Sequence, residues 1–214
     1  MVISLFTVPQ LLYIILVPIA ALIAILFLVV LPIRKLVIRK KYVEHYYREV
    51  YKIAQQNDYY LINDFVFRID DASSLTIHHV LFADKYIYLI NDFYYDGDIA
   101  GKASDKSLVC LSKKDKKHYI DNPMLFNKHV LTRLCMMTNL DPSVMIGISL
   151  VNDDIRTEIV TDSKQFYLIQ RNKLHSLIKA IESRPISNLN AKSLENLVQS
   201  INKMNKRKNK NVRD

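Results

Sequence analysis

The 214-residue sequence has only three glycines, two cysteines and no charged side chain before Arg34. A glycine-rich phosphate-binding loop needs several glycines within a few residues, so this class of nucleotide site is excluded. No serine has a partnered histidine at a recognisable spacing, so the sequence gives no support to nucleophilic catalysis. Cys110 and Cys135 are expected to be reduced thiols, with Cys135 buried on a helix; a disulfide between them is the alternative.

The absence of charge near the N-terminus predicts a membrane anchor. Within the uncharged segment 1–33, the run 11–31 would measure about 31 Å as a helix, which is enough to cross the hydrocarbon core of a bilayer. Membrane helices tolerate an internal proline such as Pro18. A cleaved signal peptide is the alternative, but no Lys or Arg precedes the run and no A-x-A-like cleavage site follows it. We therefore expect one transmembrane helix within 1–33.

Positive charge is concentrated in two parts of the chain. Residues 34–52 carry seven Lys/Arg and two acids, and residues 203–214 carry six Lys/Arg and one acid, whereas the 150 residues between them have 17 basic and 18 acidic groups. The near-neutral body argues against a basic nucleic-acid-binding domain. Because Lys and Arg that follow a membrane span tend to stay inside, we expect a single-pass protein of the cell membrane with its N-terminus outside and its domain in the cytoplasm. The side chains expected to contact anionic lipid are Arg34, Lys35, Arg39, Lys40, Lys41, Lys206, Arg207, Lys208 and Lys210.

The apolar patterns after the anchor predict an α/β domain with a mixed central sheet flanked by helices. We divide the chain into an anchor (1–33), a basic juxtamembrane helix (34–56), the α/β domain (57–185), a short amphipathic helix (186–204) and a basic disordered tail (205–214). Helical patterns cover 41–56, 122–138 and 173–183, and strand patterns cover 59–69, 75–82, 86–91, 107–111, 144–151 and 165–169. The strands at 75–82 and 86–91 should form a β-hairpin, and turns are expected at 70–74 and 113–117.

Three segments of this domain resemble a known family. Residues 75–80 read LTIHHV, residues 86–101 read YIYLINDFYYDGDIAG, and residues 122–127 read NPMLFN. In this order they resemble the nuclease-related domain, NERD, whose pattern runs T-Q-I-D-H, then G-I-F-V-I-E-T-K-N-Y-x-G-x-I-x-G, and later N-P-x-x-Q-N. Gly97 and Gly101 match the two glycines of G-x-I-x-G. The resemblance covers about residues 45–183 and implies the restriction-endonuclease-like PD-(D/E)xK fold.

The same resemblance identifies where a nuclease site would lie. Such a site uses two acidic side chains to hold magnesium and a lysine to orient the attacking water. The motif match gives these roles to His78, Asn91 and Phe93, and none of the three has the required side chain. Of the neighbouring acids, Asp92 is expected on the strand face opposite Asn91, and Asp98 is expected in a turn.

Two adjacent histidines offer a different chemistry. His78 and His79 follow each other in a strand, so we expect them on opposite faces, where they could not share a metal ion. His79 matches the family's histidine and is expected to be structural, while zinc binding by His78 is the alternative. The lysine-rich turn 113–117 is expected to be a solvated hairpin tip, with phosphate contact as the alternative.

The sequence therefore predicts a catalytically inactive, nuclease-related domain that is anchored in the membrane and acts as a binding or scaffold module at its cytoplasmic face. One alternative is a metal-dependent nuclease with a displaced active site. Another is a lipid-surface scaffold that organises other membrane proteins. No metal and no cofactor is expected. The expected partners are anionic lipid and a protein, with nucleic acid as an alternative to the protein.

Overall fold

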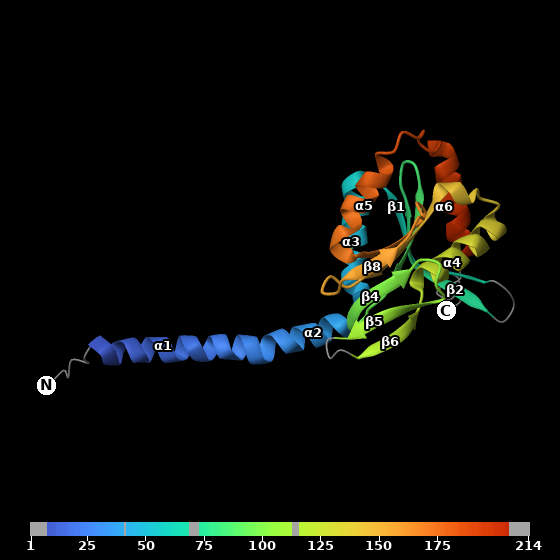
Figure 1. The fold of residues 1–214 in the computed structure, drawn as a ribbon. Coiled ribbons are helices and arrows are strands. Elements are labelled where there is room, and N and C mark those ends of the chain that lie inside the picture. Colours follow the sequence, from blue (N-terminus) through green and yellow to red (C-terminus); the bar gives the residue numbers. More distant parts are fainter. Residues whose placement is uncertain (1–7, 41, 69–72, 113–115, 206–214) are drawn as a thin grey trace. The chain divides into compact units, whose positions relative to one another are not determined.

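The computed structural model describes residues 8–40, 42–68, 73–112 and 116–205, and it divides into two compact units, 1–41 and 42–214 (Figure 1). The helix expected at 34–56 is divided between them, because residues from Tyr42 onward belong to the second unit. The turns expected at 70–74 and 113–117 and the tail after Asn205 lie largely or wholly outside the described residues.

The first unit is a continuous helical run. It consists of α1 (Val8–Ile25), a π-helical stretch (Leu26–Val30) and α2 (Leu31–Lys40). In the π-helical stretch the N–H of Leu31 bonds to the carbonyl of Leu26, five residues earlier. Pro32 accounts for this widening, because proline has no N–H and its ring would collide with the carbonyl of Leu28, four residues before it.

One segment of this run, Ile15–Arg34, is long and apolar enough to cross a membrane, with a mean hydropathy of 3.0. The side chains described in this segment are exposed, as they are in a helix without a protein neighbour. A signal sequence near an N-terminus passes the same test of length and composition, so the membrane span belongs with the proposals below.

The second unit is built on a mixed five-stranded sheet with the order β1-β2-β3-β7-β9. The strands β1, β2 and β3 are antiparallel, and β3, β7 and β9 are parallel. Their bounds are Tyr60–Arg68 (β1), Ser74–Phe82 (β2), Ile87–Asp92 (β3), Met145–Val151 (β7) and Phe166–Gln170 (β9). The predicted mixed sheet and the β2–β3 hairpin are confirmed.

Helices cover both faces of this sheet (Figure 1). On one face, α3 (Tyr42–Asn57) and α5 (Leu174–Glu182) pack on the sheet through a cluster that includes Val50, Ile53, Tyr88, Ile148 and Ile178. On the other face, α4 (Pro123–Thr138) and α6 (Ala191–Met204) pack through a cluster that includes Phe65, Ile77, Leu89, Leu134 and Ile201. The result is a three-layer α/β/α arrangement, as the sequence predicts.

The local sequence sets the ends of the covering helices. Asn122 caps α4, because its Oδ1 accepts the N–H of Met124 at 2.9 Å, and Pro123 occupies the first helical turn. The helix ends at Asn139, whose left-handed backbone (φ 54°) is one that asparagine tolerates. Asn190 caps α6, because its Oδ1 accepts the N–H groups of Lys192 and Ser193.

A second, four-stranded sheet is the main departure from the prediction. Its order is β6-β5-β4-β8, and its strands are β4 (Gly97–Lys102), β5 (Ser107–Ser112), β6 (Lys117–Asp121) and β8 (Thr157–Val160). Of these the sequence indicated only β5, and Asp98 lies in β4 instead of a turn. These strands are short and half-exposed, so their apolar alternation is too weak to read from the sequence.

The two glycines of the G-x-I-x-G pattern have steric roles in this second sheet. A Cβ on Gly97 would lie 2.1 Å from the carbonyl oxygen of Leu111, so β4 and β5 approach each other closely there. Gly101 has a φ of +149°, a backbone conformation that L side chains rarely adopt. Both glycines are therefore explained by the local backbone alone.

Candidate functional site

The β2–β3 hairpin ends its main-chain ladder at the pair His79–Ile90, and the following residues bond through their side chains. The N–H of His78 donates to Oδ1 of Asn91 at 3.1 Å, and the N–H of Asp92 donates to Nδ1 of His78 at 2.8 Å. Oδ1 of Asn91 and Nδ1 of His78 thus take the place of the main-chain carbonyls that accept these N–H groups in a regular ladder. Two of the three residues at the expected nuclease positions are together, and both hold the strands to each other.

A buried chain of hydrogen bonds continues from this point into α4 and β7. After the bond from His78 to Asn91, Nδ2 of Asn91 donates to Oδ1 of Asn127 at 2.7 Å. Nδ2 of Asn127 donates to Oγ of Ser149 at 2.9 Å, and Oγ of Ser149 donates to the carbonyl of Pro123 at 3.0 Å. The side chains of Asn91, Asn127 and Ser149 all belong to buried residues.

The direction of every bond in this chain is fixed by its ends. The N–H of His78 can only donate, and the carbonyl of Pro123 can only accept. Each amide between them therefore has one allowed orientation, and Asn91 must present an N–H to Asn127. A carboxylate at position 91 would set an acceptor against Oδ1 of Asn127 and leave both buried groups unsatisfied. Position 91 is thus an amide for a structural reason.

Phe93, at the expected lysine position, lies among aromatic rings. It stacks on Tyr95, with ring centres 6.2 Å apart and planes 7° apart, and meets Phe126 edge-on at 6.2 Å. Its backbone is also held, because its N–H donates to the carbonyl of Leu150 at 2.8 Å and its carbonyl accepts the hydroxyl of Tyr46 at 3.3 Å. The position supports packing and offers no charge to a phosphate.

Asp92 lies on the other face of the sheet from Asn91, as the strand alternation predicts. Its Oδ2 is 2.9 Å from Nε2 of His79, and Nδ1 of His79 is 2.7 Å from Oδ1 of Asn63. Burial, together with the charge of Asp92, raises the pKa of Tyr46 on α3. The carboxylate is buried, and among the described residues its Oδ1 has no hydrogen-bond partner. His79 thus connects Asn63 of β1 with Asp92 of β3.

The expectation that the two histidines point away from each other is wrong for His78. Its Nδ1 is 3.6 Å from Oδ2 of Asp92, the same oxygen that His79 approaches at 2.9 Å. The reason is that the ladder has already ended at His79, so the imidazole of His78 can turn toward the N–H of Asp92. Burial, only partly opposed by the charge of Asp92, lowers the pKa of His78 and favours the neutral ring that accepts this N–H.

A metal ion is not supported by this geometry. Among the described residues, no group of three or more His, Cys, Asp or Glu side chains is placed to hold one. Nδ1 of His78 is already an acceptor for a main-chain N–H, and Asp92 is committed to His79. The two thiols, Cys110 and Cys135, are buried and unpaired, and burial raises the pKa of each.

The carboxyl ends of the parallel strands, where open α/β sheets bind ligands, are also closed by internal bonds. After β7, Nδ2 of Asn152 donates to the carbonyl of Tyr95 at 3.0 Å, and Oδ1 of Asn152 accepts the N–H of Tyr95 at 2.9 Å. Asp153 forms an ion pair with Arg171, which follows β9. These polar groups stabilise loops and are not directed into an open site.

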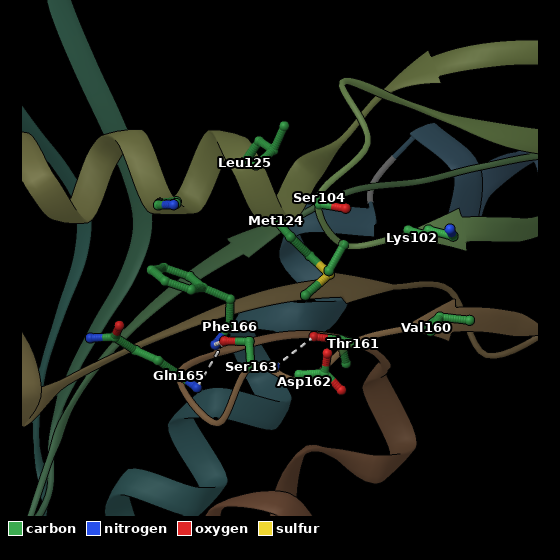
Figure 2. A pocket seen from close by; sticks show the side chains of 12 residues that line it. Lys102, Ser104, Met124, Leu125, Val160, Thr161, Asp162, Ser163, Gln165 and Phe166 are labelled. Carbon is green, nitrogen blue, oxygen red and sulfur yellow. Dashed lines mark hydrogen bonds between the residues drawn. The ribbon is translucent and has the colours of Figure 1, made fainter.

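An open cavity of about 480 Å³ lies elsewhere, between the start of α4, the end of β4 and the β8–β9 connection (Figure 2). Oγ1 of Thr161 accepts the N–H of Ser163, and Oγ of Ser163 accepts the N–H groups of Gln165 and Phe166. With these oxygens engaged as acceptors, both hydroxyls keep a hydrogen to donate. The lining also includes Lys102, Ser104, Met124, Leu125, Lys128, Val160 and Asp162. The described lining thus combines these two hydroxyl donors with two lysines and one carboxylate around the cavity.

The residues expected at the lipid surface are only partly described. Arg34 is exposed in α2, and the backbones of Lys35, Arg39 and Lys40 lie in the same helix. Lys41 and the tail residues Lys206, Arg207, Lys208 and Lys210 lie outside the described residues.

Sequence reasoning missed three side chains of the site. Asn63 lies in β1, Asn127 in α4 and Ser149 in β7, so no local spacing connects them. A signal existed for Asn127, which is the last residue of the N-P-x-x-x-N segment. Nothing in the sequence marks Ser149 within its apolar strand as a hydrogen-bonding partner.

Comparison with known proteins adds little. No family model matches the chain, and no curated protein matches it significantly. Among solved structures, the chain is similar to the crystal structure of a protein of unknown function, AF1548, with 9% sequence identity and a TM-score of 0.32, over 73% of this chain and 78% of that one. A likeness at this level carries no argument. The nuclease-related resemblance therefore gains no support from known proteins.

Proposed function

We propose that this chain is a membrane-anchored binding or scaffold module whose domain is a non-catalytic relative of the nuclease-related domains and faces the cytoplasm. Segment Ile15–Arg34 is the proposed span, and the basic residues after it support the proposed orientation. One surface available to such a module is the open cavity between the start of α4, the end of β4 and the β8–β9 connection.

The observation that carries the loss of catalysis is the directional chain of hydrogen bonds through Asn91. A magnesium-dependent phosphodiesterase must gather negative charge around the ion. Here the two acid positions are His78 and Asn91, and both are used as partners of main-chain or buried amide groups. Phe93 supplies no cation, because its ring packs on Tyr95 and Phe126.

The test is a cleavage assay on the full chain in lipid nanodiscs. Labelled DNA and RNA are incubated with the protein and with Mg²⁺ or Mn²⁺, and a known magnesium-dependent nuclease is run beside it. We expect no cleavage above that of empty nanodiscs. Chelator-sensitive cleavage that purifies with the protein would overturn the proposal.

One observation favours the alternative of a displaced nuclease site. The Oδ1 atom of Asp92 is buried without a partner among the described residues, and His78 and His79 both approach the same carboxylate. If cleavage is found, Asp92→Asn should abolish it while Asp141→Asn should not, because the exposed carboxylate of Asp141 bonds to Ser143. Loss in neither variant would exclude Asp92 as the displaced acid.

The proposed lipid contact is tested separately. Each Lys or Arg near an anionic surface contributes about 1 kcal/mol at low salt, and salt weakens this attraction. A chain lacking residues 1–33 should therefore sediment with vesicles that contain phosphatidylserine at low ionic strength and release near physiological salt. Binding that is equal for neutral vesicles, or that ignores salt, would reject the electrostatic contact.

A further inference from the structure

The strand β6 forms one edge of the four-stranded sheet (Figure 1). Its inner side pairs with β5, and no described strand pairs with its outer side. A strand edge of this kind presents unpaired N–H and C=O groups, which another strand can use. The strand has only five residues, Lys117–Asp121, and all except Ile120 are exposed.

The main-chain groups that face outward can be identified. In an antiparallel pair, hydrogen-bonded and non-hydrogen-bonded residue pairs alternate. The N–H of Ser112 bonds to the carbonyl of Lys116, and at the other end the N–H of Asn122 bonds to the carbonyl of Lys106. Even-numbered residues of this strand therefore face β5. The N–H and C=O groups that face away from β5 belong to the odd-numbered residues, which are Lys117, Tyr119 and Asp121.

The side chains of the same three residues share the outer face of the sheet. His118 and Ile120 stand opposite the fully buried Cys110 and Leu108, so the even-numbered side chains face the core. On the outer face, Tyr119 is 69% exposed, and its neighbour across β5 is Val109. Leu111, opposite Lys117, is 46% exposed. An apolar strip thus runs across the outer face and stops at the β6 edge.

We propose that β6 pairs with β6 of a second copy of this chain, antiparallel and centred on Tyr119. In this register Tyr119 faces Tyr119 of the second copy, and Lys117 faces Asp121 of the second copy on both sides. All three pairs are of the hydrogen-bonded type, because the odd-numbered residues carry the outward main-chain groups. The two apolar strips become continuous through the paired tyrosines.

Charge selects this register over its competitors. Opposite charges directly across an antiparallel pair are favourable, and like charges are unfavourable. A shift of four residues in either direction sets Lys117 against Lys117 or Asp121 against Asp121. Parallel pairing in register brings like charges side by side at both ends. The centred antiparallel register pairs both charges with an opposite charge and uses the whole strand.

A pair of five-residue strands is a small contact by the standard of about 1,000 Å² for specific interfaces. Anchoring in a membrane, which rests on the proposed function, confines the copies to one surface and raises their effective concentration. We therefore expect the pairing to form on the membrane and to weaken when detergent dilutes the chains.

Cysteine cross-linking tests the pairing in the full chain. Hydrogen-bonded partners across two antiparallel strands have Cα atoms about 5.5 Å apart, within the range that a disulfide spans. Tyr119→Cys in membranes should therefore give a disulfide-linked dimer on mild oxidation. The matched control is Val160→Cys, which lies on β8 at the opposite edge of the same sheet and is 68% exposed in the native chain. Equal cross-linking of the two variants would indicate random collision and overturn the proposal.

Charge exchange in the Tyr119→Cys background gives the second test. Lys117→Asp places an acid against Asp121 of the second copy on both sides, so we expect cross-linking to fall about tenfold. Asp121→Lys should lower it equally, and the double exchange should restore it. Unchanged cross-linking in either single variant would overturn the proposed register. Membrane fractionation of the same samples reports the anchor independently, so a failed anchor and a failed strand pairing give different results.

Discussion

The two sheets of the folded unit differ in how much of them is covered. Every residue of β3 and β7, at the centre of the five-stranded sheet, is buried, whereas four of the five residues of β6 are exposed. At the covered sheet, the side chains of Asn91, Asn127 and Ser149 bond to one another, whereas Oδ1 of Asp92 has no partner among the described residues. The four-stranded sheet ends in the exposed strand β6, whose outer side pairs with no described strand, and it borders the open cavity. The first sheet thus supplies the centre of the buried core, whereas the second leaves much of its surface accessible to solvent.

The largest expected effect is the removal of a side chain from the covered sheet. Ile148→Ala leaves a cavity between α3, α5 and the sheet, and should lower the free energy of unfolding by about 2–5 kcal/mol. Urea denaturation followed by circular dichroism in detergent measures this change. Val160→Ala in the exposed sheet is the matched control and should cost less than about 0.5 kcal/mol. Similar losses of unfolding free energy in both variants would show that the two sheets do not differ in their contribution to stability.

A smaller loss is expected when the directional chain of hydrogen bonds is interrupted. Asn91→Asp places a carboxylate against Oδ1 of Asn127, and should destabilise the domain by about 1–3 kcal/mol at pH 7. Part of the loss should be recovered at low pH, where a protonated aspartic acid can donate again. Asn196→Asp, on the exposed side of α6, is the control and should be close to neutral. A fully stable Asn91→Asp variant would show that the amide is not required there.

A substitution in the segment that connects β8 to β9 should lower the free energy of unfolding by a smaller amount. Ser163→Ala removes the acceptor for the N–H groups of Gln165 and Phe166, where β9 begins. Because the segment is partly exposed and water can replace the hydroxyl, we expect a loss of about 0.5–1.5 kcal/mol. Ser104→Ala, across the same cavity, should have no measurable effect on unfolding. A loss of stability as large as that of Ile148→Ala would show that this connecting segment is as important for stability as the covered sheet.

The smallest effect is a pH dependence from His78, whose side chain is 26% exposed. Burial lowers its pKa below the value of about 6.5 expected in the unfolded chain. Between these two values the unfolded state binds more protons, so stability should rise with pH and be complete above about pH 6.5. His78→Asn keeps an acceptor for the N–H of Asp92 and should flatten this part of the profile.

A second group, Glu182, also makes stability depend on pH, so the two proteins must be compared at the same pH values. Burial raises the pKa of Glu182, which acts in the opposite sense and is unaffected by a change at His78. The difference between the melting profiles of the two proteins at pH 5.5 and 7.5 therefore isolates His78. Identical profiles would mean that the imidazole is not in a buried, neutral state.

The five-stranded sheet was readable because its strands are rich in aromatic and branched apolar residues. Segment 145–151 is buried along its whole length, and the β2–β3 pair is joined by a short link. The helix over 123–138 was readable from Asn122 and Pro123 at its start. The short strands β4, β6 and β8 were not. Strands β6 and β8 have at most two half-buried residues each, and the glycines of β4 interrupt its strand pattern.

The candidate site shows the same limit at the level of single residues. The sequence placed the expected nuclease roles at His78, Asn91 and Phe93 and excluded the required charges there. It also predicted that Asp92 faces away from Asn91. The turn of the His78 ring toward Asp92 could not be predicted, because it depends on where the ladder between β2 and β3 ends.

What the sequence determined by itself is local: the apolar N-terminal helix, the covered strands and helices, the helix caps, and the identity of the side chains at the motif positions. Periodicity, proline and capping residues act over a few residues, and so they can be read in order. The tertiary structure decided what depends on residues far apart in the chain. Residues 78, 91, 127 and 149 become one hydrogen-bonded chain only after β2, β3, α4 and β7 have packed together. The β6 edge likewise exists only because β4 and β8 complete the sheet on its other side, so the charges of Lys117 and Asp121 gain a common outer edge through folding.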